Sequence, residues 1–412
     1  MQITIHRGID QIGGCITEIA TSQARILIDL GQNLPDNKGN SNDPLATKEA
    51  IESLTDGVDA IFYTHYHGDH VGLFNFVPND IPQYIGKVAK EVCICKHTRL
   101  GKIDGREYLS AEEVAAFERM TPLVKNQSVQ IKDITITPYL VSHSAYESFM
   151  FLIEAEGKRI LHTGDFRDHG YLGKGLYKVL DAYIKEVDVL ITEGTMLTRS
   201  DKPKHESILQ KEFVEAMRQY KNVFVVSSST DLDRLATIHS AHNKSKAGQP
   251  FVCDTFQKQL FDIFTASTKE YCEALFDFDD AITFESRTAN IWNGFTMLIR
   301  STDKYAVWLD KLLPKLNPSE TCVIFSMWGE YINVGGKHAV ESYLKTVSRF
   351  DKILRIHTSG HASAECLAKV CTLTNPRLAI IPIHSERSAD YSKLPIPDEM
   401  KGKIFLGETF SL

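Results

Sequence analysis

Short apolar and alternating runs dominate the first half of the chain. They cover residues 3–7, 15–19, 25–29 and 58–63, and then residues 134–140, 149–154, 159–162 and 187–192. Runs of this length between glycine or polar turns are typical of β-strands. One helix is expected over residues 44–54, with Asp43 as its N-cap. Cys93 and Cys95 lie in a strand-like Val-Cys-Ile-Cys segment. The first half of the chain is therefore predicted to be rich in sheet.

The pattern changes after a polar, proline-containing stretch over residues 199–204. Beyond it, helical and extended patterns alternate. Helices are expected over residues 206–220, 231–243 and 337–347 and from Gln257 onward, with strands over residues 223–227, 251–253 and 322–325. This alternation predicts a parallel α/β domain, joined to the first region by a linker.

Composition places the chain among ordinary globular proteins. Its 412 residues are 43% hydrophobic and 24% charged, and this length favours two domains. No apolar run is long enough to span a bilayer, and residues 1–14 do not resemble a signal peptide. Eight scattered cysteines without zinc-ribbon spacing predict reduced thiols in a cytoplasmic protein. The net charge of −7 argues against a broad polyanion-binding surface, although a local cationic groove stays compatible with it.

The most informative motif is His65-Tyr66-His67-Gly68-Asp69-His70, which follows the apolar run at 58–63. Its three imidazoles and one carboxylate are nitrogen and oxygen donors, as borderline and hard cations prefer. Residues two apart on an extended backbone point the same way, so His65 and His67 are expected to share one metal ion. Gly68 permits a sharp turn that directs the next two residues toward a second ion. A surface tract with incidental metal affinity would instead need a polar, low-complexity context.

Three further candidates each follow a predicted strand. His143 comes after residues 138–141, Asp165 ends residues 160–165, and His384 comes after residues 379–383. A lone histidine after a strand is more often structural than a ligand. Together with the opening motif, however, these residues supply enough donors for two ions. A central carboxylate such as Asp165 can bridge two metal ions about 3.5–4 Å apart.

In this order, these motifs resemble those of the metallo-β-lactamase superfamily. Asp29, in Leu27-Ile28-Asp29-Leu30-Gly31, resembles the aspartate of that superfamily that supports the metal ligands from behind. Glu193 in Thr-Glu-Gly-Thr, His361 in Ser-Gly-His-Ala and His384 in Ile-His-Ser-Glu resemble the later motifs of the β-CASP nucleases. The complete set is most similar to that of ribonuclease J-like ribonucleases. Two departures are Glu193, where ribonuclease J usually has aspartate, and the C-terminal domain of ribonuclease J, which this chain is expected to lack.

The resemblance implies a role for each matching residue. One zinc ion would be bound by His65, His67, His143 and Asp165, and the other by Asp69, His70, Asp165 and His384. His361 would protonate the leaving 3′ oxygen, Glu193 would orient His361 or the site around it, and Asp69 would also take part in catalysis. A structural role for Glu193, capping a turn at the strand end, is the alternative. Phosphodiester hydrolysis needs a nucleophile at neutral pH, charge neutralisation and an acid, and this set can provide all three.

The resemblance also implies an α/β architecture in which one domain is inserted into another. If His384 and Asp165 share a site, the intervening chain must leave that site and return. We therefore expect an αββα metallo-β-lactamase sandwich over residues 1–203 and 355–412, with an inserted parallel α/β β-CASP domain over 204–354. A cleft between the two domains would hold the substrate.

Two serine-rich turns are candidates for binding the end of the substrate. Ser227-Ser228-Ser229-Thr230 precedes a predicted helix, whose N-terminus can seat a phosphate, and Thr358-Ser359-Gly360 is the second turn. In ribonuclease J, similarly placed serines hold a 5′-monophosphate, which implies substrate binding by Ser227, Ser229, Ser359 and Gly360. Ordinary helix capping by Ser229 or Thr230 is the alternative.

Nucleic-acid contacts outside these turns are also considered. Lys202, Lys204, Lys244 and Lys246 are candidates for a nucleic-acid track, unless they are only solvated. Trp328 is expected either to stack on a base or to be buried.

The sequence thus predicts a cytoplasmic, zinc-dependent ribonuclease that uses two Zn²⁺ ions, with Mn²⁺ as the alternative metal. It is expected to act on single-stranded RNA as a 5′-to-3′ exonuclease with some endonuclease activity, without a membrane partner, and to form a homodimer. His384 favours RNA over DNA, because DNA-directed members often have an apolar residue there. A DNA-directed β-CASP nuclease and a catalytically silent RNA-processing scaffold are the alternative functions, and a small-molecule hydrolase would not need the inserted domain.

Overall fold

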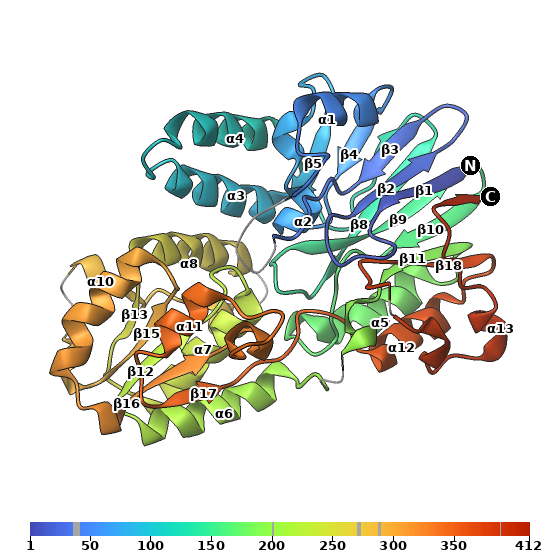
Figure 1. The fold of residues 1–412 in the computed structure, drawn as a ribbon. Coiled ribbons are helices and arrows are strands. Elements are labelled where there is room, and N and C mark those ends of the chain that lie inside the picture. Colours follow the sequence, from blue (N-terminus) through green and yellow to red (C-terminus); the bar gives the residue numbers. More distant parts are fainter. Residues whose placement is uncertain (36–41, 200–201, 270–272, 287–289, 388) are drawn as a thin grey trace. The chain divides into compact units, whose positions relative to one another are not determined.

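The computed structural model describes residues 1–35, 42–199, 202–269, 273–286, 290–387 and 389–412. The chain divides into two compact units, each described by itself (Figure 1). Unit 1 contains Met1–Leu34, the segment that ends at Lys202, and Gly360–Leu412. Unit 2 contains Pro203–Ser359 and a short segment that begins at Pro35. Within the described residues, no helix is long and apolar enough to cross a membrane.

Two sheets form the centre of unit 1. The strand order of the first sheet is β19-β1-β2-β3-β4-β5-β6. Its strands are β1 (Gln2–Arg7), β2 (Ile16–Ala20), β3 (Arg25–Ile28), β4 (Ala60–Phe62), β5 (Gln83–Gly86), β6 (Thr121–Leu123) and β19 (Thr409–Ser411). Because β1 pairs with β19, the two chain ends lie side by side, and the Leu412 N–H donates to the Met1 carbonyl (Figure 1).

The second sheet of unit 1 has the strand order β18-β11-β10-β9-β8-β7. Its strands are β7 (Val129–Ile131), β8 (Ile134–Val141), β9 (Ser148–Ala155), β10 (Lys158–His162), β11 (Val189–Glu193) and β18 (Ala379–Ile383). Strands β10, β11 and β18 are parallel neighbours, although β18 lies far along the sequence. Their carboxyl ends therefore meet at one edge of the sheet.

The two sheets of unit 1 pack face to face. Ile26, Ile28 and Phe62 of the first sheet share a buried cluster with Phe151 and Ile191 of the second. Because side chains alternate along a strand, the opposite face of each sheet also needs a cover. Helices α1 (Lys48–Thr55) and α3 (Lys87–Leu100) cover the first sheet, and α4 (Glu107–Arg119) packs on α3 (Figure 1).

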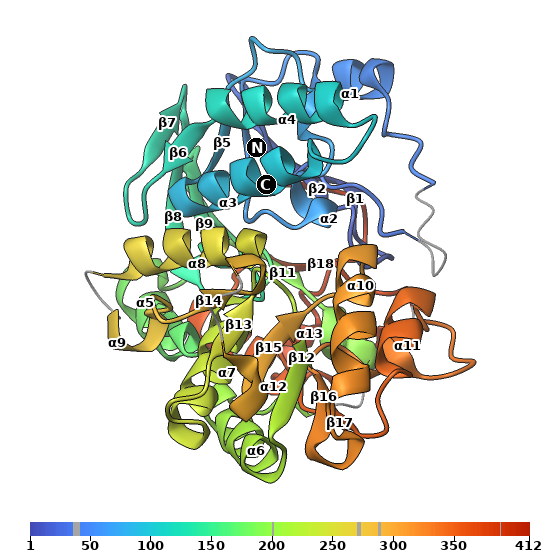
Figure 2. The same cartoon turned by 90° about the vertical axis from the view of Figure 1, so that its left-hand side faces the viewer.

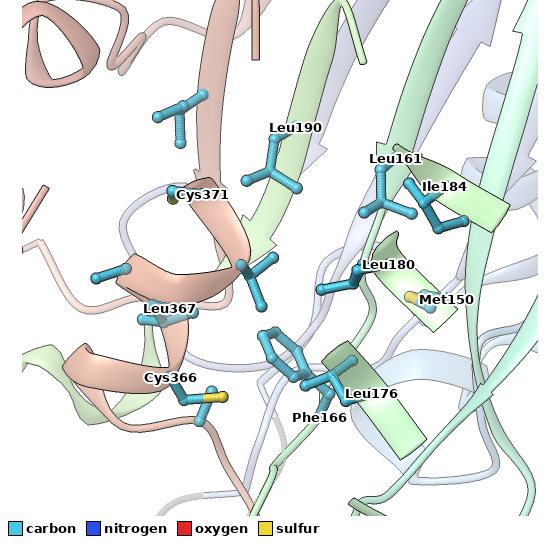
Figure 3. Close-up of a cluster of buried hydrophobic side chains, with 14 of the residues drawn as sticks. Met150, Leu161, Phe166, Leu176, Leu180, Ile184, Leu190, Cys366, Leu367 and Cys371 are labelled. Carbon is cyan, nitrogen blue, oxygen red and sulfur yellow. The ribbon is translucent and has the colours of Figure 1, made fainter. Parts of the chain in front are cut away.

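Helices α5 (Leu176–Val179) and α12 (Ala364–Thr374) cover the second sheet. In Figure 3 the ring of Phe166 lies between Leu367 of α12 and the helical segment that carries Leu176 and Leu180. Unit 1 is thus the expected αββα sandwich. Phe166 directly follows Asp165, so its burial anchors the turn on which Asp165 stands.

Unit 2 is built on a parallel sheet with the strand order β14-β13-β15-β12-β16-β17. Its strands are β12 (Asn222–Val226), β13 (Phe251–Cys253), β14 (Ile282–Thr283), β15 (Phe295–Ile299), β16 (Thr321–Phe325) and β17 (Ile353–Arg355). One face packs on α10 (Asp303–Leu312) and α11 (Glu341–Val347). The other face is covered by α6 (Glu206–Gln219), α7 (Leu232–Ser245) and α8 (Thr255–Thr268) (Figure 2). The expected α/β fold class, with its parallel α/β insert, is confirmed.

Unit 2 extends to Ser359, beyond the boundary expected after residue 354. The reason is local bonding. β17 pairs with β16, and the buried Arg234 of α7 donates to the Thr358 carbonyl at 3.3 Å. The hydroxyl of Thr358 also accepts from the Lys204 backbone N–H at 2.9 Å, which ties the returning chain to the start of the unit.

Two expected elements are wrong. Helix α1 begins at Lys48, with Thr47 as its N-cap, rather than at residue 44 behind Asp43. Asp43 instead accepts hydrogen bonds from Arg7 and from the Asn33 and Leu45 backbone. The segment with Cys93 and Cys95 belongs to helix α3 and not to a strand, because packing of a helical face overrides its β-branched neighbours.

Candidate metal centre

All seven expected metal ligands lie in unit 1, in turns or at helix starts that follow strands. His65 and His67 follow β4, and the short helix α2 (Gly68–Val71) carries the next two candidates, Asp69 and His70. The others, one after each strand, are His143 after β8, Asp165 after β10 and His384 after β18. The structure therefore brings together residues that are more than three hundred positions apart.

The first ligand group consists of three imidazoles. His65 Nε2 and His143 Nε2 each lie 3.2 Å from His67 Nδ1. The donor atoms of a tetrahedral zinc ion with Zn–N bonds of about 2.0–2.1 Å are about 3.3 Å apart. Asp165 Oδ2 lies 3.8 Å from His143 Nε2 and 4.0 Å from His65 Nε2, which makes it the nearby carboxylate for this group.

The second ligand group shares the same carboxylate oxygen. Asp165 Oδ2 lies 3.2 Å from His70 Nε2 and 3.5 Å from His384 Nε2. Asp69 Oδ2 lies 3.2 Å from His384 Nε2. Asp165 is thus placed between two sets of donors, as a bridging carboxylate must be.

The donor set fits divalent cations. Asp165 Oδ1 and His70 Nε2 are buried and have no hydrogen-bond partner within the described part of the chain. Buried polar atoms are almost always paired, because an unpaired one costs about 1–3 kcal/mol. A cation would satisfy both atoms, and the nitrogen and carboxylate donors are those of Zn²⁺ or a similar ion.

Two of the strand ends use backbone strain to aim these side chains. Asp29 has φ 62° directly after β3, and His384 has φ 50° directly after β18. The left-handed region costs a residue with a side chain about 1–2 kcal/mol, and such strain is concentrated at functional sites. Gly68 was expected to provide the turn in the histidine motif, but it simply begins helix α2, and the helical turn itself directs Asp69 and His70.

Hydrogen bonds fix the orientation of four of the imidazoles. Nδ1 of His70 lies 2.7 Å from Asp29 Oδ2, which is the contact that the expected supporting role of Asp29 requires. The other partners were not found from the sequence: Thr64 Oγ1 for His65 (3.0 Å), the Gly360 carbonyl for His143 (2.7 Å) and Thr195 Oγ1 for His384 (2.7 Å). Such contacts to the second ring nitrogen set which nitrogen faces a metal. All three partners lie near expected site residues, and Gly360 was itself expected to bind substrate, but no sequence pattern indicated these hydrogen bonds.

The electrostatics favour neutral imidazoles in the first ligand group and an ionised Asp165, whereas in the second group the nearby Asp165 outweighs burial and raises the pKa of His70 and His384. Burial lowers the pKa of His65, His67 and His143, and that of His67 to about 4. Burial alone would raise the pKa of Asp165, but the facing His384 and His70 lower it well below its ordinary value. At neutral pH, the first group therefore offers nitrogen lone pairs and Asp165 offers a carboxylate, which are the forms that bind metal ions.

His361 and Glu193 form a pair beside the cluster. His361 Nδ1 lies 2.9 Å from Glu193 Oε2 and 3.7 Å from Asp165 Oδ2, and the His361 side chain is 19% exposed. Glu193 is fully buried, and its Oε1 accepts from the Phe166 and Ala362 backbone N–H groups. Glu193 therefore orients His361 and also fixes the turns next to Asp165 and His361.

The expected substrate-binding residues fall in both units. The three serines belong to unit 2, and Gly360 begins the last segment of unit 1. Ser227 Oγ is buried and without a hydrogen-bond partner among the described residues, and Arg300 donates to Ser229 Oγ. Helix α7 is capped by Asp231, so capping by Ser229 or Thr230 is wrong. Ser359 is the last residue of the unit.

The other nucleic-acid candidates of unit 2 have local partners. Lys246 is buried and donates to the Tyr220 and Lys221 carbonyls, which removes it from any track. Lys204 pairs with Glu212, and Lys244 donates to Gln210. Trp328 is half-buried and packs against Tyr331 and His338.

Comparison with known proteins identifies the family. Residues 24–227 match the model of the β-lactamase superfamily domain, a range that contains β3, the histidine motif, His143, Asp165 and Glu193. The chain contains a domain of the metallo-β-lactamase superfamily. Members of the superfamily use divalent metal ions, in agreement with the His/Asp cluster.

Within the superfamily, similar curated proteins bear ribonuclease names. An RNase J-like protein of Methanocaldococcus jannaschii is 28% identical over 228 residues, covering 53% of this chain and 48% of the relative. Ribonuclease J of Mycoplasma genitalium is 22% identical over 407 residues, covering 92% of this chain and 67% of the relative. The chain spans between a third and a half of the length of the first curated relatives that it matches.

A solved structure supports the fold over the entire chain. A crystal structure of a protein of unknown function from Enterococcus faecalis V583 matches with a TM-score of 0.73 and 20% identity, and the match covers 100% of this chain and 99% of the other. At this identity the likeness concerns the fold alone.

Proposed function

We propose that this protein is a metal-dependent nuclease of the β-CASP group that hydrolyses RNA phosphodiester bonds, and that unit 2 is its inserted β-CASP domain. The observation that carries the proposal is Asp165, whose Oδ2 lies between two sets of imidazole and carboxylate donors while its Oδ1 has no hydrogen-bond partner within the described residues. The ribonuclease names of the similar curated proteins favour RNA as the substrate.

The residues of the site would divide the work of hydrolysis. His65, His67, His143 and Asp165 would hold one Zn²⁺ ion, and Asp69, His70, His384 and Asp165 the other, with Mn²⁺ as the alternative metal. Bound divalent cations supply a hydroxide nucleophile at neutral pH and neutralise the charge of the phosphate. His361, held through Nδ1 by Glu193, would donate a proton from its other ring nitrogen to the leaving 3′ oxygen.

A 5′-to-3′ exonuclease activity, with some endonuclease activity, is part of this proposal. It rests on the serine turn of unit 2, where the buried Ser227 hydroxyl and the Ser229 hydroxyl next to the Arg300 guanidinium can receive a terminal phosphate. Asp254 also binds Arg300, which reduces the net positive charge of this turn. A homodimer and a cytoplasmic location belong to the same proposal, by the resemblance alone.

The proposed metal chemistry is tested by His65→Ala combined with His67→Ala. These changes remove two of the four ligands of the first group, so RNA cleavage is expected to fall to background and the bound metal by about one ion per chain. His338→Ala, in unit 2, is the matched control and should keep both the RNA cleavage and the bound metal. Activity that survives in the double variant while its metal content falls would show that the metal ions are not the catalyst.

The substrate is tested with end-labelled RNA and DNA of the same sequence. RNA that carries a 5′-monophosphate, triphosphate or hydroxyl is digested and resolved by size. Release of mononucleotides mainly from the monophosphate form is expected. Preferential cleavage of DNA would replace RNA in the proposal, and no cleavage of either polymer by metal-loaded protein would favour a silent scaffold.

A further inference from the structure

A cysteine lies at the second ligand group, outside the set of ligands that the resemblance implies. Ligand atoms of Cys15, His70 and His384 all lie within 4.8 Å of one another, and all three residues are buried. The other described cysteines of unit 1 are Cys93 and Cys95 in α3 and Cys366 and Cys371 in α12. Among these cysteines of unit 1, Cys15 is the one that lies at the second ligand group, so its position needs a separate explanation.

The backbone holds Cys15 firmly in this place. It stands immediately before β2, its N–H donates to the Asp69 carbonyl at 3.0 Å, and its carbonyl accepts from the Gly31 N–H at 3.0 Å. The first of these bonds ties Cys15 to helix α2, which carries Asp69 and His70. Gly8 lies alongside, where a Cβ atom would come within 3.2 Å of Cys15 Sγ and 3.6 Å of the His384 backbone nitrogen.

An independent observation indicates that a ligand belongs between these side chains. His70 Nε2 is fully buried and has no hydrogen-bond partner in the described ranges, while Nδ1 of the same ring is held by Asp29. This nitrogen faces Asp165 Oδ2 at 3.2 Å, and Cys15 lies beside the same ligand group, since its sulfur is within 4.8 Å of ligand atoms of His70 and His384. A thiol is a weak hydrogen-bond donor and does not by itself satisfy a buried imidazole nitrogen.

We propose that Cys15 Sγ is a ligand of the cation in the second group, which gives that ion a sulfur donor. On binding, the S–H bond breaks, its proton passes to solvent and a sulfur–metal bond forms, without a change in oxidation state. Thiolate ligands favour Zn²⁺ and Co²⁺ over Mn²⁺, which prefers oxygen donors. The proposal deepens the proposed function and rests on it, because it names the donor that makes this group selective for zinc.

The proposal is tested by replacing the bound metal with Co²⁺ and recording absorption spectra of the full-length protein. The wild type is expected to show a near-ultraviolet sulfur-to-cobalt charge-transfer band in addition to the visible bands of cobalt. Cys15→Ser should lose this band and keep the visible bands and bound cobalt. Cys93→Ser, which removes an equally buried thiol from helix α3, should keep both.

The possible outcomes separate this inference from the proposed function. Cobalt bound by the wild type without a charge-transfer band, or a band that persists in Cys15→Ser, would overturn the role of Cys15 and leave the metal centre intact. A wild type that binds no cobalt would overturn the metal centre as well. If Cys15→Ser does not fold, X-ray absorption of the zinc-loaded wild type decides the matter, since a sulfur ligand at about 2.3 Å must then be present.

Discussion

Residues of the metal centre owe their positions to neighbours that do not themselves face a cation. Glu193 is the clearest case, because one oxygen binds the His361 ring and the other binds the backbone of Phe166 and Ala362. Glu193→Gln keeps an oxygen that can accept from these N–H groups, so under the proposed function the effect of that change on catalysis passes through His361. A residue that acts only through another leaves a specific signature in double variants.

His361→Ala is expected to slow single-turnover RNA cleavage by about 10²–10⁴-fold, which is the usual contribution of general acid–base catalysis. Glu193→Gln should slow it less, because the imidazole remains but its ring is no longer held by a carboxylate. The double variant should be no slower than His361→Ala. Glu154→Gln, at a half-exposed carboxylate of β9, serves as control and should be neutral. If the rate of the double variant fell by the product of the two single losses, Glu193 would not act through the positioning of His361.

At the scale of elements, Glu18 of β2 ties together three strands of the first sheet. Its Oε2 lies 2.8 Å from His6 Nε2 on β1 and 2.8 Å from an Arg25 nitrogen on β3. Burial alone would raise the pKa of Glu18, but the hydrogen bonds from His6 and Arg25 outweigh it and lower the pKa from 4.5 to about 2. The contribution of Glu18 to stability is therefore complete above pH 4.5 and is lost as the pH falls toward 2.

Urea unfolding followed at about pH 5 and about pH 3 should reveal this contribution. Between these two pH values, the free energy of unfolding of the wild type is expected to fall by about 1–2 kcal/mol more than that of Glu18→Gln, whose side chain does not titrate. Glu52→Gln removes an exposed carboxylate paired with Lys48 on α1 and should behave like the wild type. An equal loss in Glu18→Gln and the wild type would show that this carboxylate does not stabilise the sheet.

At the scale of the whole molecule, the unfolding of the two units can be followed separately, because they contain different probes. Every expected metal ligand lies in unit 1, whereas all three tryptophans of the chain, Trp292, Trp308 and Trp328, lie in unit 2. A ligand stabilises only the cooperative unit to which it binds. Tryptophan fluorescence therefore follows unit 2, and calorimetry follows both units.

Removal of metal by a chelator is expected to lower the midpoint temperature of one calorimetric transition. The midpoint of the transition followed by tryptophan fluorescence should stay unchanged. A cation at a hundredfold excess over its Kd stabilises its unit by about 2.7 kcal/mol, so the shift should be readily measured. The His65→Ala, His67→Ala double variant should respond much less to the chelator. An equal shift of the tryptophan transition would mean that the units unfold together.

Much of the fold and of the candidate site could be predicted from the sequence. The strands β1, β3, β8, β9 and β10 follow local apolar patterns that the structure retains. The candidate ligands were found from chemistry and order, since His65, His67, His143, Asp165 and His384 each come shortly after a strand. Local errors arose where a distant partner decided the outcome, as with Asp43, which binds Arg7 instead of opening helix α1.

The sequence by itself determined which donors are available and that they lie at strand ends, because residue chemistry and side-chain periodicity are local properties. Only the tertiary structure decided which atoms meet. It pairs β18 with β11, and thereby brings His384 to Asp165 across a whole inserted unit. It also brings the Gly360 carbonyl to His143 and the thiol of Cys15 to His70. Contacts of this kind depend on the packing of distant segments, which leaves no spacing or periodicity in the sequence.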